Sequence, residues 1–250
     1  MNFTPNQKTD VMKKVFAYMV ISGLLLMSSC LVSSLHPFYK EKDKIFDPAM
    51  LGSWIDSDSC IWTIEKNMVS DEFMGPEYHD SKYRLTYYEE EGRIGHFIGT
   101  LFELKGIKYV DFYPDPNEDH CESDLSDIHH FPTHTLARVQ LEQDILMFYW
   151  YGDEWLNELL EQNRIRIKHE TVDVYSDYKR HLLTAPTDEL QKFIIKYANN
   201  AKTGIDVDQI FELGFTEEGM EDLGAFLKLQ PYHGTLPGKK AKQVKTNHVN

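Results

Sequence analysis

The sequence predicts a mainly β protein, an antiparallel barrel or curved meander of strands followed by helices toward the C-terminus. Three observations support this class. Short runs alternate apolar and polar residues, clusters of turn-forming residues separate the runs, and the wider apolar spacing of helices appears only in the later part of the chain.

The first group of strands is expected between Gly52 and Tyr113, after a helical turn at Asp47-Pro48. Within this region Cys60, Trp62 and Ile64 share one face, so one side of their strand is apolar. Turn sequences at Ser57-Asp58-Ser59, Glu89-Glu90-Glu91-Gly92 and Lys105-Gly106 separate the runs. The expected strands are Gly52–Asp56, Cys60–Lys66, Tyr83–Tyr88, Arg93–Leu104 and Ile107–Tyr113.

Further strands and the helices are expected after an acidic, His-rich insertion that ends near Pro132. Asp153 is placed to cap a short helix to Gln162, and Thr187 is placed to cap a second one, with acidic residues in its first turn. Residues 164–169 alternate again. The remaining elements are expected to be strands at His134–Leu141 and Ile145–Tyr151 and helical fragments at Asp206–Leu213 and Glu217–Leu229.

The N-terminal segment has the order of a secretory signal peptide. Lys13 and Lys14 precede an uncharged stretch, Val15–Met27, which is shorter than the ~20 residues that cross a bilayer. Counting on to Leu35 leaves an uncleaved membrane anchor as the alternative. We expect cleavage, with residues 1–29 removed.

Leu26-Met27-Ser28-Ser29-Cys30 resembles a bacterial lipobox. The resemblance implies cleavage before Cys30 and a thioether-linked diacylglycerol on its thiol, which would hold the protein at a membrane. Ordinary secretion, with Cys30 inside the discarded peptide, is the alternative. Since neither Asp nor an acidic run follows Cys30, the sorting rules of such lipoproteins favour the inner leaflet of the outer membrane, facing the periplasm.

The chain is strongly acidic, with 26 Lys and Arg against 40 Asp and Glu and a formal net charge of −14. Such a chain repels phosphate backbones, and no run of the body is densely basic, so we expect no nucleic-acid partner. Residues 239–250 are rich in Lys and lack apolar periodicity, which predicts a disordered basic tail.

Gly52-Ser53-Trp54, at the opening strand, resembles the Gly-x-Trp signature of lipocalin-like barrels, whose Trp plugs the closed end. A wider set of short motifs resembles a family of bacterial envelope lipoproteins of uncharacterised activity. These motifs are Leu35-His36-Pro37, Phe46-Asp47-Pro48, Leu51-Gly52-Ser53-Trp54, Pro132-Thr133-His134-Thr135, Leu182-Leu183-Thr184-Ala185 and Glu189-Leu190-Gln191. The resemblance covers about residues 30–200 and implies a calycin-like barrel in the cell envelope. It implies nothing about catalysis.

The insertion between Asp115 and His134 concentrates imidazole, carboxylate and thiol groups, which suit a borderline cation such as Zn²⁺. The candidate metal ligands are His120, Cys121, His129, His130 and His134. His120-Cys121 and His129-His130 are adjacent pairs, whose side chains diverge, and the set has no recognised metal-binding spacing. A solvated acidic loop is therefore the competing interpretation. A disulfide between Cys60 and Cys121 is left open, because the sequence does not show whether the two residues meet.

A barrel of this size can hold a small apolar ligand, for which aromatic residues at strand spacing are the candidate wall. These residues are Trp54, Trp62, Tyr83, Tyr87, Phe97, Phe102, Phe148 and Trp150. The same residues can instead form a packed core. Because the chain has no Gly-x-Ser-x-Gly elbow and no glycine-rich phosphate loop, we expect neither an enzyme nor a cofactor.

Together these observations predict a noncatalytic, lipid-anchored envelope protein that acts as a structural or interaction module. The alternative is a periplasmic carrier of a small apolar ligand or a metal ion. The expected parts are a signal peptide (1–29), a tether (30–46), a β domain with a C-terminal helix (47–200), a helical extension (201–238) and the tail (239–250). The expected partners are the membrane and either another envelope protein or the apolar ligand.

Overall fold

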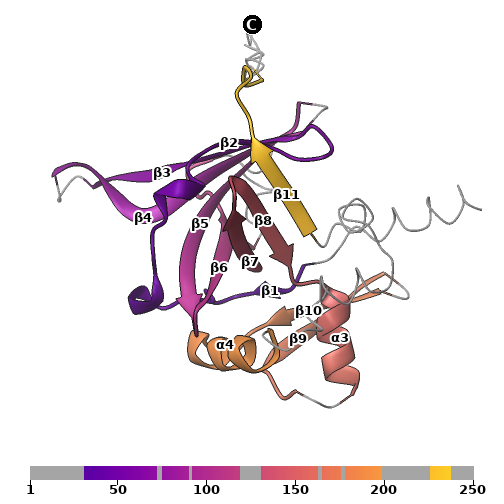
Figure 1. The fold of residues 1–250 in the computed structure, drawn as a ribbon. Coiled ribbons are helices and arrows are strands. Elements are labelled where there is room, and N and C mark those ends of the chain that lie inside the picture. Colours follow the sequence, from indigo (N-terminus) through magenta and orange to yellow (C-terminus); the bar gives the residue numbers. More distant parts are fainter. Residues whose placement is uncertain are drawn as a thin grey trace, which may run out of the picture.

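The computed structural model describes residues 31–71, 75–89, 92–118, 131–162, 165–175, 178–198 and 226–237. In this part of the chain eight antiparallel strands close into a barrel (Figure 1). The closed barrel confirms the predicted mainly β class. Further strands and two α-helices lie around the outside of the barrel.

Seven of the eight barrel strands follow one another along the chain, each pairing antiparallel with the next. They are β2 (Gly52–Ile55), β3 (Ile61–Asp71), β4 (Gly75–Tyr88), β5 (Ile94–Leu104), β6 (Ile107–Pro114), β7 (His134–Glu142) and β8 (Ile145–Trp150). Lys105 and Gly106, with φ of 54° and 82°, make the tight turn between β5 and β6, as the sequence predicts. Strands β3 and β4 are longer than predicted, and their hairpin extends away from the barrel (Figure 1).

The eighth strand, β11 (Phe226–Pro231), corrects the predicted C-terminal helical extension. It lies between β8 and β2 and closes the barrel, with Leu227 beside Phe148 and Leu229 beside Leu146. Alternate residues of β11 therefore face the barrel interior, where Leu229 is fully buried. Residues 201–225, which include the predicted fragment Asp206–Leu213, lie outside the described residues.

The predicted tether is also corrected, because from Leu31 onward it belongs to the fold. Leu31 bridges Gly152, and Val32 is 2% exposed. Strand β1 (Ser33–Ser34) pairs antiparallel with β7 and parallel with β10 (Tyr178–Leu183), which pairs with β9 (His169–Tyr175). These three strands form a small side sheet, which branches from the barrel beside the end of β8.

The helices lie between β8 and β11, so they precede the last strand instead of following all strands. Helix α3 (Asp153–Glu161) begins at the predicted residue, and α4 (Thr187–Phe193) continues through a π turn, η3 (Ile194–Ala198). Pro186, and not Thr187, occupies the N-cap position of α4. The Thr187 hydroxyl instead donates a hydrogen bond to the Pro37 carbonyl at 2.8 Å. No described helix is both long enough and apolar enough to cross a bilayer.

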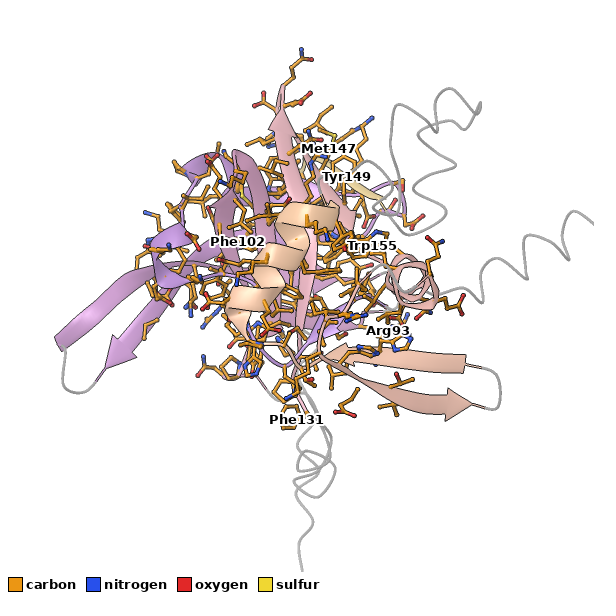
Figure 2. All side chains as sticks on the ribbon, turned by 90° about the horizontal axis from the view of Figure 1, so that it is seen from below. Arg93, Phe102, Phe131, Met147, Tyr149 and Trp155 are labelled. Atoms are coloured by element: carbon orange, nitrogen blue, oxygen red, sulfur yellow. The ribbon has the colours of Figure 1, made fainter. Side chains whose placement is uncertain are left out.

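Two apolar cores lie on opposite sides of the barrel wall. In β5, Leu101 belongs to the inner core and Phe102 to the outer core, and both are fully buried. The outer core is covered by α3, by α4 and by residues 32–39. Figure 2 looks onto this covering layer, with Phe102 and Trp155 labelled beside α4.

A short segment covers one end of the barrel. The 3-10 turn η1 (Glu41–Asp43) leads into this segment, and a second 3-10 turn, η2 (Pro48–Met50), lies within it. The Asp47 side chain caps η2 by accepting a hydrogen bond from the Ala49 backbone at 3.1 Å, as the predicted helical turn requires. We call residues 44–51 the strap.

Candidate functional site

The barrel interior brings together most of the aromatic residues that the sequence predicts as a cavity wall. They come from five strands, and register places them on the same face of the sheet. These interior residues are Trp54, Trp62, Tyr83, Tyr87, Phe97, Phe148 and Trp150. Phe112, which the sequence analysis did not select, joins them with ring centroids 5.5 Å from Phe148 and 4.7 Å from Trp150.

Phe102 is the exception among the predicted wall residues. It stacks on Tyr109 outside the barrel, with ring centroids 5.5 Å apart. Phe97 and Phe102 lie an odd number of positions apart along β5, so a two-residue period puts them on opposite faces. The spacing alone therefore indicates that both cannot line one cavity.

One end of the barrel is closed by the strap. Met50 is 2% exposed there, and the Trp54 indole N–H donates to the Met50 carbonyl at 3.1 Å. Phe46 stacks on Tyr83 with ring centroids 4.9 Å apart. Burial raises the pKa of the Tyr83 phenol to about 12, so this hydroxyl stays protonated and can donate.

The opposite end of the barrel is more accessible. Tyr87, Phe97, Trp150 and Leu227 face inward, yet each is only partly buried. They lie near the end of β4, the start of β5, the end of β8 and the start of β11, which the antiparallel order brings to the same end. We call this the open end.

Two polar groups lie beside the open end. The Asp56 carboxylate accepts hydrogen bonds from the Cys60 backbone at 2.8 Å and from the Trp62 indole at 3.4 Å. Burial raises the pKa of Asp56, and burial together with the nearby Cys60 side chain raises the pKa of Tyr87. The open end thus combines apolar surface with a carboxyl and a phenol.

The middle of the barrel is tightly packed. A Cβ atom added to Gly99 would lie 2.5 Å from Leu85 Cδ1 and 3.4 Å from Val110 Cγ1. Both neighbours are fully buried, so neither can move aside without disturbing the core. Side chains therefore occupy this level of the barrel, below the open end.

A buried carboxylate outside the barrel was missed by the sequence analysis. Asp111 is 1% exposed and lies on the outer face of β6. Its oxygens accept a hydrogen bond from the Phe38 backbone at 2.8 Å and contact His134 Nδ1 at 2.7 Å. Burial raises the pKa of this carboxyl, and the bond to His134 opposes that effect. An Asp in the middle of an apolar strand was the only sequence signal for this site.

The Asp111–His134 pair resembles the base and orienting acid of a catalytic group, but its contacts are structural. The His134 ring stacks on Tyr113, with centroids 4.6 Å apart. The nearby Ser34 hydroxyl donates to the Leu183 carbonyl and accepts from the His36 backbone. Asp111 thus joins β6 to His134 of β7 and to the backbone of Phe38, which lies in residues 35–43, called here the leader. Among the described residues no nucleophile is brought to His134.

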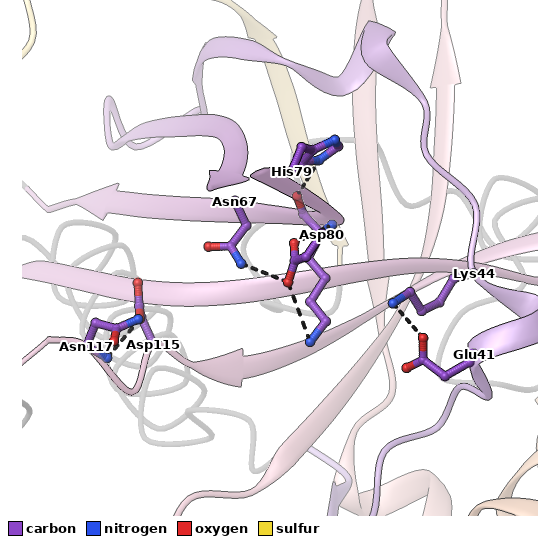
Figure 3. A network of polar contacts seen from close by, with 8 residues as sticks. Glu41, Lys44, Asn67, His79, Asp80, Asp115 and Asn117 are labelled. Carbon is purple, nitrogen blue, oxygen red and sulfur yellow. Dashed lines mark hydrogen bonds and ion pairs between the residues drawn. The ribbon is translucent and has the colours of Figure 1, made fainter. Parts of the chain in front are cut away.

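A second polar network lies where β6 leads into the acidic insertion. Asp115 is fully buried and contacts Arg84 at 3.2 Å. It also accepts two hydrogen bonds from Asn117 (Figure 3). On the neighbouring β4, Asp80 accepts a hydrogen bond from Asn67 at 3.0 Å. Each carboxylate is held by partners of its own chain, which is typical of turn and strand stabilisation.

The remaining predicted site residues fall on parts of the chain that are not described. Cys30, His120, Cys121, His129 and His130 lie outside the described residues. The lipidation, the disulfide and the metal site at the insertion therefore stay predictions. Within the described ranges, no group of three or more His, Cys, Asp and Glu side chains is arranged to hold a metal ion.

Comparison with known proteins gives no match: no family model, no curated protein and no solved structure matches the chain.

Proposed function

We propose that this protein is a noncatalytic lipoprotein of the bacterial cell envelope, anchored through a diacylglycerol on Cys30, and that its barrel is a structural or interaction module. The proposed address is the inner leaflet of the outer membrane, facing the periplasm. A closed antiparallel barrel is compatible with the lipocalin-like, calycin-type fold that the sequence motifs suggest.

One observation carries the proposal. The lipobox-like sequence ends at Cys30, and the next two residues are already part of the fold: Leu31 bridges Gly152 and Val32 is buried. A cut before Cys30 would thus release the whole described body and keep every residue of β1. A cut farther along, as in ordinary secretion, would remove buried parts of the side sheet.

The packing of the barrel supports a module over a carrier. The strap closes one end, and Gly99 leaves no room for even one more methyl group beside Leu85. A filled interior stabilises the domain but leaves little volume for a ligand. The outer surface is then the part of the molecule left to act on partners.

The test is the covalent state of the native N-terminus. Mass spectrometry of the protein extracted from bacterial envelopes is expected to find Cys30 as the first residue, carrying an acyl-modified thioether. The Cys30→Ser variant is expected to lose the acyl group and to bind membranes more weakly than the acylated protein. An intact N-terminus upstream of residue 30, without an acyl adduct, contradicts the proposal.

A second function is favoured by the open end. Because Tyr87, Phe97 and Trp150 are partly exposed there beside the Asp56 carboxyl, a small molecule with an apolar body and a polar group is the ligand class that fits. In this alternative the protein carries such a ligand at the mouth of the barrel. Titration with a fluorescent fatty acid is expected to saturate, and Trp150→Ala is expected to weaken binding. Phe131→Ala, at an apolar residue that is 77% exposed elsewhere, is the matched control.

A further inference from the structure

The side sheet has one buried and one outward face. Val32 and Leu183 point into the outer core and are almost fully buried. Their neighbours along the strands point the opposite way. Register aligns Arg180 with Val172, and Leu182 with both Ser33 and Glu170. The outward face therefore carries Leu31, Leu182 and Val172, with Arg180 among them.

The same alternation continues before β9, where the sequence predicts a strand from residue 164. Ile165 and Ile167 are buried, whereas Arg166 and Lys168 are exposed. The Lys168 carbonyl accepts a hydrogen bond from the Thr184 backbone at 3.0 Å, so this run stays beside β10. Arg166 and Lys168 thus extend the outward face of the side sheet. We call Leu31, Arg166, Lys168, Val172, Arg180 and Leu182 the basic face.

The charge of this face is opposite to that of the protein. Arg166, Lys168 and Arg180 are exposed, and Glu170 is the one acidic side chain that register places among them. Within the described ranges none of the three cations forms an ion pair. The Arg180 guanidinium donates to Ser33 Oγ at 3.0 Å, which places it over β1. Tertiary structure thus adds Arg180 to the two cations that the run 166–168 already provides.

Apolar residues are interleaved with these cations. Val172 is 52% exposed, one of the most exposed large apolar side chains of the described residues, and Leu31 and Leu182 are partly exposed. Cations beside exposed aliphatic side chains match a phospholipid surface, whose phosphates attract the cations and whose acyl region accepts the apolar groups.

We propose that the basic face docks on the leaflet that holds the lipid anchor. This inference rests on the proposed diacylglycerol at Cys30. Because Leu31 is already paired to Gly152, a single peptide unit connects the anchored Cys30 to the folded body, and a trans peptide unit spans only about 3.8 Å. A body with so short a connection cannot swing away from the membrane, and the face next to the anchor meets the lipid headgroups. The protein is therefore held in one orientation, with the segment that follows β11 pointing away from the membrane, on the side opposite β9 and β10 (Figure 1).

Photo-cross-linking tests this orientation. A genetically encoded photo-cross-linking residue is placed at Val172 and, as a control, at Leu236, which is also apolar and exposed and belongs to the segment after β11. The acylated proteins are reconstituted in vesicles of phosphatidylethanolamine and phosphatidylglycerol. We expect cross-links to phospholipid from position 172 and none from position 236. An acylated protein that gives no lipid cross-link at 172 overturns the docking and leaves the proposed function intact.

Other outcomes of the cross-linking distinguish lipid from a second copy of the protein at this face. A cross-link from position 172 to a second copy, in place of lipid, overturns membrane docking and identifies the face as a contact between copies. If mass spectrometry of the reconstituted protein shows no acyl group on Cys30, both the proposed function and this inference fall.

The charges are tested without the anchor. The Cys30→Ser protein is mixed with the same vesicles, and Arg180→Gln or Lys168→Gln is expected to weaken binding about fivefold each, since one cation near an anionic surface is worth ~1 kcal/mol. Lys66→Gln, at an exposed cation on β3, is expected to leave binding unchanged. Equal effects of Lys66→Gln and Lys168→Gln would show that no particular face is used and would overturn the proposal.

Discussion

Tyr83 and Asp47 exchange two hydrogen bonds across the closed end of the barrel. The Asp47 backbone N–H donates to Tyr83 Oη at 2.7 Å, and the Tyr83 hydroxyl donates to the Asp47 carbonyl at 3.1 Å. The Tyr83 side chain comes from β4, so these bonds fix the strap to the barrel wall. Phe46 and Met50, on the same strap, then lie against the inner core.

Tyr83→Phe is expected to destabilise the protein by about 1–3 kcal/mol, because it leaves the part-buried Asp47 N–H without its acceptor. Chemical denaturation measures the change. Tyr232→Phe is the matched control, since the Tyr232 hydroxyl makes one exposed hydrogen bond to the Thr235 carbonyl at 3.0 Å. Equal costs of the two substitutions would contradict the role given to Tyr83.

Gly99→Ala is expected to destabilise the fold by about 1–3 kcal/mol, because the new methyl group overlaps Leu85 inside a filled barrel. Gly152→Ala is the control: a Cβ at that position would have no atom within 4 Å. Denaturation midpoints of the two variants give the comparison. A neutral Gly99→Ala would show that the barrel holds spare volume, and it would favour the carrier alternative.

Gln191 holds the leader against α4. Its side-chain amide donates to the Phe38 carbonyl at 3.2 Å and to the Asp43 carboxylate at 2.8 Å. Gln191→Ala is expected to cost about 1–3 kcal/mol, since it leaves a buried carbonyl without its donor, and to speed proteolysis between residues 38 and 44. Lys192→Ala, at the exposed neighbouring residue, is expected to change neither the stability nor the rate of this proteolysis. Unchanged cleavage in the Gln191 variant would mean that other contacts hold the leader.

The alternating strands of the barrel were predictable because each strand buries one face. Burial of one face requires apolar residues at every second position, and this pattern is visible in the sequence. Strand β11 was not predictable, since Leu227 and Leu229 are its only inward aliphatic residues with a described environment, and two positions are too few to establish a two-residue period. Strand β1 is two serines that are buried only because β7 and β10 lie on either side of it. Pairing between segments so distant in sequence leaves no local pattern.

Of the candidate site, local periodicity predicted the inward aromatic residues but not what lies around them. Asp111 is buried because Phe38 and His134 approach it from other elements, which no property of β6 reveals. The basic face has the same origin. Arg166 and Arg180 belong to two separate runs of the sequence, and the side sheet brings them together on one face.

Asp111 and Asp47 are expected to give the protein opposite pH dependences. Burial raises the pKa of Asp111, whereas the hydrogen bond from Lys108 at 2.9 Å lowers the pKa of Asp47. The unfolded reference for both is about 3.9. Since the folded protein binds the Asp111 proton more tightly, the stabilising contribution of that group is full below the reference value and is lost as the pH rises through its raised pKa.

For Asp47 the sign is reversed. The folded protein favours the ionised carboxylate, so its stabilising contribution is present above the reference value and is lost as the pH falls through the lowered pKa. Urea denaturation across the acidic range measures this difference. As the pH rises, the free energy of unfolding of Asp111→Asn is expected to increase relative to that of the wild type, and that of Asp47→Asn is expected to decrease relative to it. The amide introduced by Asp111→Asn still offers a carbonyl oxygen to the Phe38 N–H, so the comparison isolates the charge. Parallel pH profiles for the two variants would show that the bond to His134 outweighs burial at Asp111, and would contradict this prediction.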